Sequence, residues 1–219
     1  MSRSDENRAP GPRSRAKLIG VAEKLFAERG IHGVGIREIV TEAGFKNVAS
    51  IRYHFGTKEN LIREIMSGGL HISEEWRVAK LKELEGRGAD FAMRDILLIV
   101  VGPVLHGVVT DTFMMFLTQV SLADRRLHDE VIYKATQEGM KRCSDHLRRL
   151  SGIDSVDELD TRMALLGIYL TGYMNSHYWR RSKAGVLWRK SVNWRSNAML
   201  ENFLVTAEGI LRFGHKPAF

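Results

Sequence analysis

A single cysteine, Cys143, occurs among the 219 residues. One cysteine excludes an intramolecular disulfide and a cysteine-based zinc site. Long hydrophobic runs are also missing, because the longest apolar stretch, 96–109, contains glycine, proline and histidine and is shorter than the ~20 residues of a membrane-spanning helix. Since residues 1–15 carry no apolar signal-peptide core, we expect a cytoplasmic protein that makes no use of a membrane.

Motifs of catalysis are missing too. The 8 histidines are scattered, without the H-x-x-x-H or H-E-x-x-H spacing of metal sites. Cys143 and His146 share one face of a charged helical segment, but a Cys-His pair also needs an oxyanion site, and the sequence indicates none. We found no G-x-S-x-G, phosphate-binding glycine loop or dinucleotide fingerprint. We therefore expect no enzymatic activity, no metal and no cofactor.

The charge of the chain is unevenly distributed. Hydrophobic residues make up 44% and charged residues 27% of a chain with net charge +7, a composition that is ordinary for a globular protein. Residues 1–60 hold 11 basic and 7 acidic side chains, which is more than half of the excess. This asymmetry favours a polyanionic partner at the N-terminal end, although a modest surplus also serves solubility alone.

Apolar residues recur at helical spacing along most of the chain. With their caps and glycine stops they predict helices over 13–29, 36–43, 47–55, 57–85, 91–109, 112–123, 127–150, 155–180 and 197–213. Proline 103 is expected to bend the fifth of these, and Asn47 to cap the third. No stretch alternates with a period of two. The predicted fold class is all-α, preceded by a flexible arm over residues 1–12.

The first three helices have the proportions of a helix-turn-helix. In that motif a short second helix braces a third one, which exposes polar side chains and anchors itself with few apolar ones. The expected inward anchors are Ile36, Ile39, Val40, Ala43, Ile51 and Phe55. The expected outward residues of the third helix are Ala49, Ser50, Arg52, Tyr53 and His54. Serine and arginine can read base edges, tyrosine can bond a phosphate, and alanine leaves room for a thymine methyl group.

Residues 13–66 resemble the DNA-binding domain of the tetracycline-repressor (TetR) family. The resemblance rests on A-x-x-L-F-x-x-x-G from Ala22, I-x-x-x-A-G from Ile39, and Y-H-F-G-T-K-E-N-L from Tyr53. It implies a three-helix DNA-binding domain over 13–66. A long helix then joins this domain to a larger helical ligand-binding and dimerisation domain over 67–219. The implied function is that of a repressor, binding a near-palindromic DNA operator as a homodimer and released by a small-molecule effector.

Three departures from the family's pattern lie near the predicted reading helix. Val34-Gly35 stands where relatives usually carry Thr-Ser, so a hydroxyl cap of the second helix is lost. The turn before the third helix is about one residue longer than in most members. Arg52 stands where many members have tyrosine.

Each candidate DNA contact has an expected role. Arg52 and Ser50 are the expected base readers, and Lys58 resembles the family's phosphate-gripping lysine at a helix N-terminus. The expected set of DNA contacts is Arg37, Asn47, Ala49, Ser50, Arg52, Tyr53, His54 and Lys58. Arg13, Arg15 and Lys17 are further phosphate candidates, for which an ordinary solvated surface is the alternative.

The larger part of the chain is expected to hold the dimer surface and a ligand. The helices over 155–180 and 197–213 are the candidates for dimerisation. The first shows a stripe of Leu159, Met163, Leu166, Leu170 and Met174 that could equally cover the subunit's own core. Methionines and aromatics with two polar groups could enclose an apolar effector: Met93, His106, Phe113, Met114, Met115, Phe116, Tyr169, Tyr173 and Asn175. An ordinary core is the alternative for each.

Two other functions are compatible with the pattern. One is a DNA-binding regulator that responds to no ligand. The other is a membrane-surface adaptor that uses the basic segment 180–195 with Trp179, Trp188 and Trp194.

Overall fold

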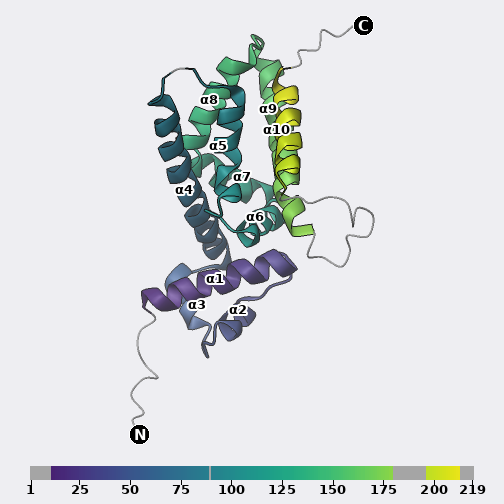
Figure 1. Ribbon diagram of the computed structural model, residues 1–219. Coiled ribbons are helices and arrows are strands. Elements are labelled where there is room, and N and C mark those ends of the chain that lie inside the picture. The colour runs from purple at the N-terminus through teal and green to yellow at the C-terminus, as the bar shows by residue number, and fades with distance from the viewer. Residues whose placement is uncertain (1–10, 89, 180–195, 213–219) are drawn as a thin grey trace. The chain divides into compact units, whose positions relative to one another are not determined.

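The computed structural model describes residues 11–88, 90–179 and 196–212, without the side chains of 174–179. These residues form ten α-helices, and the described ranges contain no strand (Figure 1). The helices are α1 (Pro12–Arg29), α2 (Ile36–Glu42), α3 (Ala49–Phe55), α4 (Lys58–Glu85), α5 (Met93–Leu105), α6 (Asp111–Ala123), α7 (Arg125–Ala135), α8 (Gly139–Ser151), α9 (Val156–Trp179) and α10 (Asn197–Arg212). The all-α prediction is confirmed. The basic segment 180–195 and most of the predicted arm lie outside the described residues.

The helices form two compact units. The first unit contains the chain up to Gly69 together with Met115–Ile132, and the second contains Leu70–Met114 and the chain from Tyr133 onward. Helix α4 begins in the first unit, ends in the second and is unbroken at Gly68 and Gly69. The first unit thus includes residues of α6 and α7 that the sequence had assigned to the larger domain.

The first unit is built on the buried face of α1. Leu18, Ala22 and Phe26 of this helix are fully buried. The expected anchors of the next two helices are buried as well, namely Ile39, Val40, Ala43, Ile51 and Phe55. Ile36 is only half-buried. The Phe26 ring stacks on Phe116 of α6 with 6.1 Å between the ring centroids, so one helix from later in the chain completes this core.

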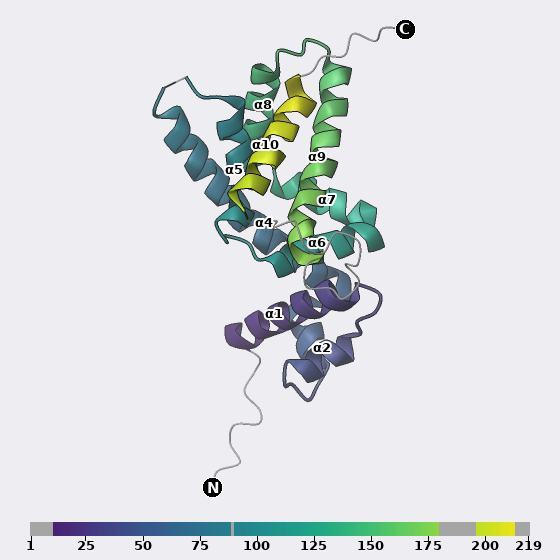
Figure 2. The same cartoon turned by 45° about the vertical axis from the view of Figure 1, so that its right-hand side comes forward.

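The second unit has a single apolar core formed mainly by α5, α8, α9 and α10. Helices α9 and α10 lie side by side in both views (Figures 1 and 2). Tyr173 of α9 stacks on Phe203 of α10 at 4.3 Å between centroids. Trp76 of α4 packs directly on Gly102 of α5, where a Cβ atom would lie 2.0 Å from the indole. Only glycine therefore fits at this position of α5.

A buried ion pair ties three helices of the second unit together. Glu74 and Arg77 of α4 are 6% and 7% exposed, with 2.9 Å between Oε1 and Nη1. Arg77 also donates to the carbonyl of Val100 in α5, at 3.3 Å and 3.4 Å. The other carboxylate oxygen of Glu74 accepts from the Met140 amide of α8 at 3.1 Å. These bonds satisfy both charged groups away from water.

The prediction of one helix over 127–150 is wrong, because the chain breaks between α7 and α8. Gly139, the first residue of α8, packs against α4 so closely that a Cβ atom would lie 2.9 Å from the Arg77 Cβ. The adjoining Met140 amide bonds to Glu74. This docking of α8 on α4 depends on residues more than sixty positions apart, which local periodicity does not report.

Helix α5 is shorter than the predicted 91–109. It begins after Ala92, whose amide donates to the Asp95 carboxylate at 2.8 Å. It ends at Leu105, and Gly107 follows with a φ of 66°, a left-handed conformation that stops helices. Across the residues described, we find no helix with the length and apolarity needed to cross a membrane.

Candidate nucleic-acid interface

Helix α3 is anchored by two side chains and presents the others outward. Ile51 and Phe55 are 1% and 6% exposed, and they fix the helix on the first unit. Arg52 is exposed, and Tyr53 is 69% exposed. The structure therefore separates anchoring from exposed residues on α3 as the apolar spacing predicts.

The turn before α3 is ordered by Asn47. Its side-chain oxygen accepts from the Ala49 amide at 2.8 Å, and its carbonyl accepts from both the amide and the hydroxyl of Ser50. The helix cap is Val48, so the prediction that Asn47 caps α3 is wrong by one residue. Because the half-buried Ser50 hydroxyl donates to Asn47, its lone pairs remain for a donor on a partner.

Val48 is a candidate contact that the sequence analysis did not single out. This valine caps α3 and is 38% exposed, directly beside the exposed Ala49. An apolar side chain at the edge of a reading helix can contact the methyl group of thymine. The signal in the sequence was a β-branched residue directly after the polar Lys46 and Asn47.

His54 is less accessible than expected. Its ring lies 5.1 Å from that of Tyr53 and 5.8 Å from that of Phe55. The Nε2 atom is buried and has no hydrogen-bond partner in the structure. The half-buried imidazole therefore supports its aromatic neighbours, with only part of its surface left for DNA.

Lys58 at the start of α4 is turned into the first unit. Its ammonium donates to the carbonyls of Ile31 and Val34, each at 2.6 Å. It also lies 5.4 Å from the centre of the Phe26 ring, a distance suited to a cation–π contact. Burial lowers the pKa of this lysine below its usual value. Two of its three N–H groups are thus committed to backbone carbonyls.

The other basic candidates differ in how they are held. Arg37 is exposed on α2, and Arg13 is exposed near the start of α1. Arg15 pairs with Glu64 and lies over the Phe55 ring at 5.6 Å. Lys17 lies over Phe45 at 5.8 Å. Arg37 and Arg13 are not held by these aromatic contacts, so they are better placed to bind a phosphate.

The expected effector residues are divided between the two units. Met93, Met114, Tyr169 and Tyr173 belong to the core of the second unit. Met115 and Phe116 belong to the first unit. His106 is exposed and stacks on Trp76 at 5.5 Å, Phe113 is buried, and the Asn175 side chain is not described.

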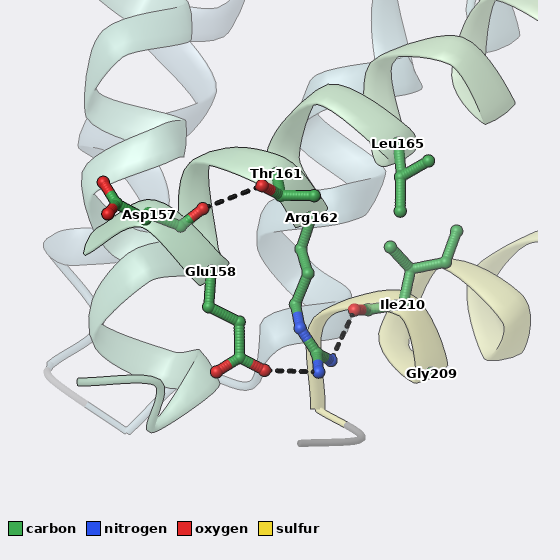
Figure 3. A pocket seen from close by; sticks show the side chains of 7 residues that line it. All are labelled: Asp157, Glu158, Thr161, Arg162, Leu165, Gly209 and Ile210. Carbon is green, nitrogen blue, oxygen red and sulfur yellow. Dashed lines mark hydrogen bonds and ion pairs between the residues drawn. The ribbon is translucent and has the colours of Figure 1, made fainter. Parts of the chain in front are cut away.

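A recess opens elsewhere on the second unit, between α9 and α10. It has a volume of about 520 Å³ and is lined by Asp157, Glu158, Thr161, Arg162, Leu165, Gly209 and Ile210 (Figure 3). Arg162 crosses it, donating to the Glu158 carboxylate at 2.7 Å and to the Ile210 carbonyl at 3.0 Å. Arg162 is thus paired with a carboxylate, and the lining carries two acidic side chains, Asp157 and Glu158, against this one cation, which does not favour an anionic guest.

The stripe predicted for dimerisation packs on the subunit's own core. Leu159 and Leu166 are buried, and Met163 and Leu170 pack against the same cluster; the Met174 side chain is not described. Exposed apolar side chains of α9 lie at other positions, among them Val156, Leu165 and Ile168, which are 60%, 51% and 71% exposed.

Cys143 is fully buried. Burial raises the pKa of its thiol to about 12, so the thiol is protonated at neutral pH and is a poor nucleophile. Among the described residues, no three His, Cys, Asp or Glu side chains are placed to hold a metal ion.

Comparison with known proteins finds a sequence match to a family at the N-terminal end of the chain, and a likeness of fold over most of the chain. The sequence model of the family "Bacterial regulatory proteins, tetR family" matches residues 18–65. The HTH-type transcriptional repressor KstR2 of Rhodococcus jostii is 34% identical over 76 residues, which is 35% of this chain and 35% of the relative. The match therefore spans about a third of that relative's length.

Solved structures share the fold along nearly the whole chain. A protein assigned to the tetR family from Shewanella sp. PV-4 has a TM-score of 0.61 at 16% identity, covering 88% of this chain and 96% of its own. A transcriptional regulator from Rhodococcus sp. RHA1 has a TM-score of 0.59 at 20% identity, covering 90% and 95%. These likenesses show the fold, and the match over residues 18–65 shows that this segment carries the sequence pattern of the tetR family of bacterial regulatory proteins.

Proposed function

We propose that this protein is a transcriptional repressor that binds double-stranded DNA as a homodimer in the cytoplasm. The observation that carries the proposal is α3, which is fixed by Ile51 and Phe55 and presents Arg52 and Tyr53 to solvent. The relatives that this chain matches over 76 and 70 residues are themselves named repressors. Their names are the reason for proposing repression, because a DNA-reading helix serves activators equally well.

The proposed contacts follow from exposure and chemistry. Arg52 reads a base edge as a bidentate donor, Ser50 accepts from a base amino group, and Tyr53 bonds a phosphate. Ala49 and Val48 leave apolar surface for a thymine methyl group. Arg37 binds a phosphate from α2, while Asn47 and His54 hold the two ends of α3 in shape and make at most peripheral contacts with DNA.

The dimer face is proposed on the exposed sides of α9 and α10. Leu165 and Ile168 are three residues apart, as neighbours on one helix face are, and Val205 and Gly209 have the corresponding spacing of four on α10. Leu165 points toward Ile210 across the recess in Figure 3. Ile168 and Val205 are 71% and 59% exposed. A face with such residues gains by pairing with its twin.

A small apolar effector remains part of the proposal. Any such ligand must prefer the state that does not bind DNA, and ~100-fold release requires ~2.7 kcal/mol of differential affinity. The densely packed core around Met93 and Tyr173 has to open to admit it. A regulator without an effector is the alternative. A thermal-shift screen of apolar metabolites distinguishes the two, because a bound ligand raises the melting temperature.

Selection of random duplex DNA by the purified protein tests the central proposal. A symmetric dimer with two reading helices enriches a near-palindrome whose half-sites lie about one DNA turn apart, ~34–36 Å. Enrichment of a single half-site contradicts the dimer. Failure to retain any duplex at low ionic strength contradicts DNA binding itself.

A further inference from the structure

The segment between α1 and α2 is tightly restrained. Gly30 ends α1 with a φ of 77°. Ile31 and Val34 are 8% and 1% exposed, so their side chains are in the core of the first unit. At Gly33 a Cβ atom would lie 2.4 Å from the Arg29 carbonyl oxygen, which leaves glycine as the residue that fits. The path of these residues decides where α2 begins.

Helix α2 starts without a side-chain cap, although Glu38 places an acidic group in its first turn. Its cap is Gly35, which has no side chain to accept a hydrogen bond from the first turn. The helix has only 7 residues, too few to be stable in isolation. The position of α2 therefore depends on tertiary contacts, of which Ile39 and Val40 provide the apolar part.

Lys58 supplies a polar tertiary contact at this point. Its ammonium bonds the carbonyls of Ile31 and Val34 at 2.6 Å each, and the second of these carbonyls belongs to the residue directly before the Gly35 cap. A phosphate therefore competes with these two carbonyls for the ammonium, of which one N–H group remains. Leaving buried acceptors without a partner costs free energy, and the contact with the Phe26 ring is lost as well.

We infer that Lys58 is a positioning residue, which fixes the start of α2 for DNA binding by holding the carbonyls of Ile31 and Val34, and is not a phosphate ligand. The inference rests on the proposed function. Lys58 acts through α2, which carries Arg37 and braces α3. Release of the α1–α2 segment lets α2 shift, so that Arg37 and the reading helix lose their register on DNA.

The structure also indicates a substitution that can stabilise the start of α2 when Lys58 is replaced. Gly35 has a φ of −93° and a ψ of 154°, the extended conformation of serine caps. A Cβ atom at this position meets nothing within 4 Å. Gly35→Ser therefore fits without strain, and its hydroxyl can accept from an amide of the first turn of α2.

The test compares variants on the selected duplex over a range of salt concentrations. We expect Lys58→Met to weaken binding about tenfold while log K against log[salt] keeps the wild-type slope. Arg37→Ala is the positive control, because loss of a phosphate contact flattens the slope by about one unit. Lys24→Met, at an exposed lysine of α1, is the neutral control. Gly35→Ser added to Lys58→Met should restore about twofold in affinity, and added to wild type it should change affinity little.

Each outcome decides the inference. A slope flattened by one unit in Lys58→Met shows a phosphate ligand and overturns it. If Lys58→Met binds DNA with full affinity at a temperature where circular dichroism shows that it is folded, the contact serves stability alone and the inference is overturned. The inference is also overturned if Gly35→Ser does not restore affinity to Lys58→Met. If wild-type protein retains no duplex, the proposed function fails instead. Thermal melting then still tests the contact, which is overturned if Lys58→Met does not lower the melting temperature and Gly35→Ser does not recover it.

Discussion

Among single residues, Arg52 bears most directly on base recognition. Its side chain is exposed on α3, beside the buried anchor Ile51. We expect Arg52→Ala to cost ~1–3 kcal/mol of binding free energy and to relax the preference at one base pair. Competition binding with the selected duplex and its single-base variants measures both effects. An equal loss on every sequence would show that Arg52 holds only the DNA backbone.

Val48 gives a second prediction for a single residue. It tests for a contact with the methyl group of thymine, as distinct from the rest of the base. If Val48 contacts a thymine methyl group, replacing that thymine by deoxyuridine removes about 0.8 kcal/mol, the value of one buried methylene. In Val48→Ala the same replacement should cost much less. Scanning deoxyuridine along the half-site with both proteins identifies the position. Identical scans for wild type and variant would exclude the contact.

Exposure along α3 was predictable, whereas the partners of Lys58 were not. Ile51 and Phe55 are four residues apart, and a spacing of one helical turn already indicates which face is buried. Lys58 bonds carbonyls 24 and 27 residues earlier in the chain. Nothing in the local pattern distinguishes such a lysine from one that faces a phosphate. The family resemblance predicted the residue, and the structure supplied its contacts.

At the scale of helices, the packing of α4, α5 and α8 depends on the buried ion pair between Glu74 and Arg77. Desolvation by burial lowers the pKa of Arg77 below its usual value, but the group keeps its charge at neutral pH because an arginine pKa starts so high. We expect Arg77→Met to destabilise the protein by about 3–5 kcal/mol, because Glu74 is left buried without its counter-charge. Thermal and urea unfolding followed by circular dichroism measure the loss.

Two further variants show whether charge or packing causes that loss. Glu74→Gln combined with Arg77→Met removes both charges and should recover part of the stability. Lys80→Met, which breaks the exposed pair with Glu83 on the same helix, should change stability by less than about 1 kcal/mol. If the double variant is no more stable than Arg77→Met, the arginine contributes by packing alone.

The helix boundaries show where local sequence is sufficient. A helix was predicted from residue 155, and α9 does begin just after Ser155, whose hydroxyl accepts from the Glu158 amide at 3.3 Å. The prediction used only neighbouring residues, as the contact does. The break before Gly139 was missed because it depends on the approach of α8 to Arg77 and Glu74. A glycine within a charged, amphipathic stretch carries no information about a helix that packs on it from elsewhere.

For the whole molecule, the property to test is the proposed assembly into a symmetric pair. Ile168 is 71% exposed on α9, on the face that we propose to meet a second copy. Ile168→Glu places one unpaired charge from each subunit in that interface and should weaken dimerisation about 100-fold or more. Sedimentation equilibrium at micromolar concentration should show a dimer for wild type and a monomer for the variant.

Assembly and operator recognition should then fail together, since a monomer presents only one reading helix to each near-palindrome. We expect Ile168→Glu to bind a full operator no better than an isolated half-site, although its α3 is unchanged. Ile72→Glu is the matched control, because Ile72 is also exposed, at 49%, but lies on α4. It should remain dimeric and keep the preference for the full operator. If Ile168→Glu remains dimeric, the second copy docks elsewhere, and the exposed side chains of α9 and α10 need another partner.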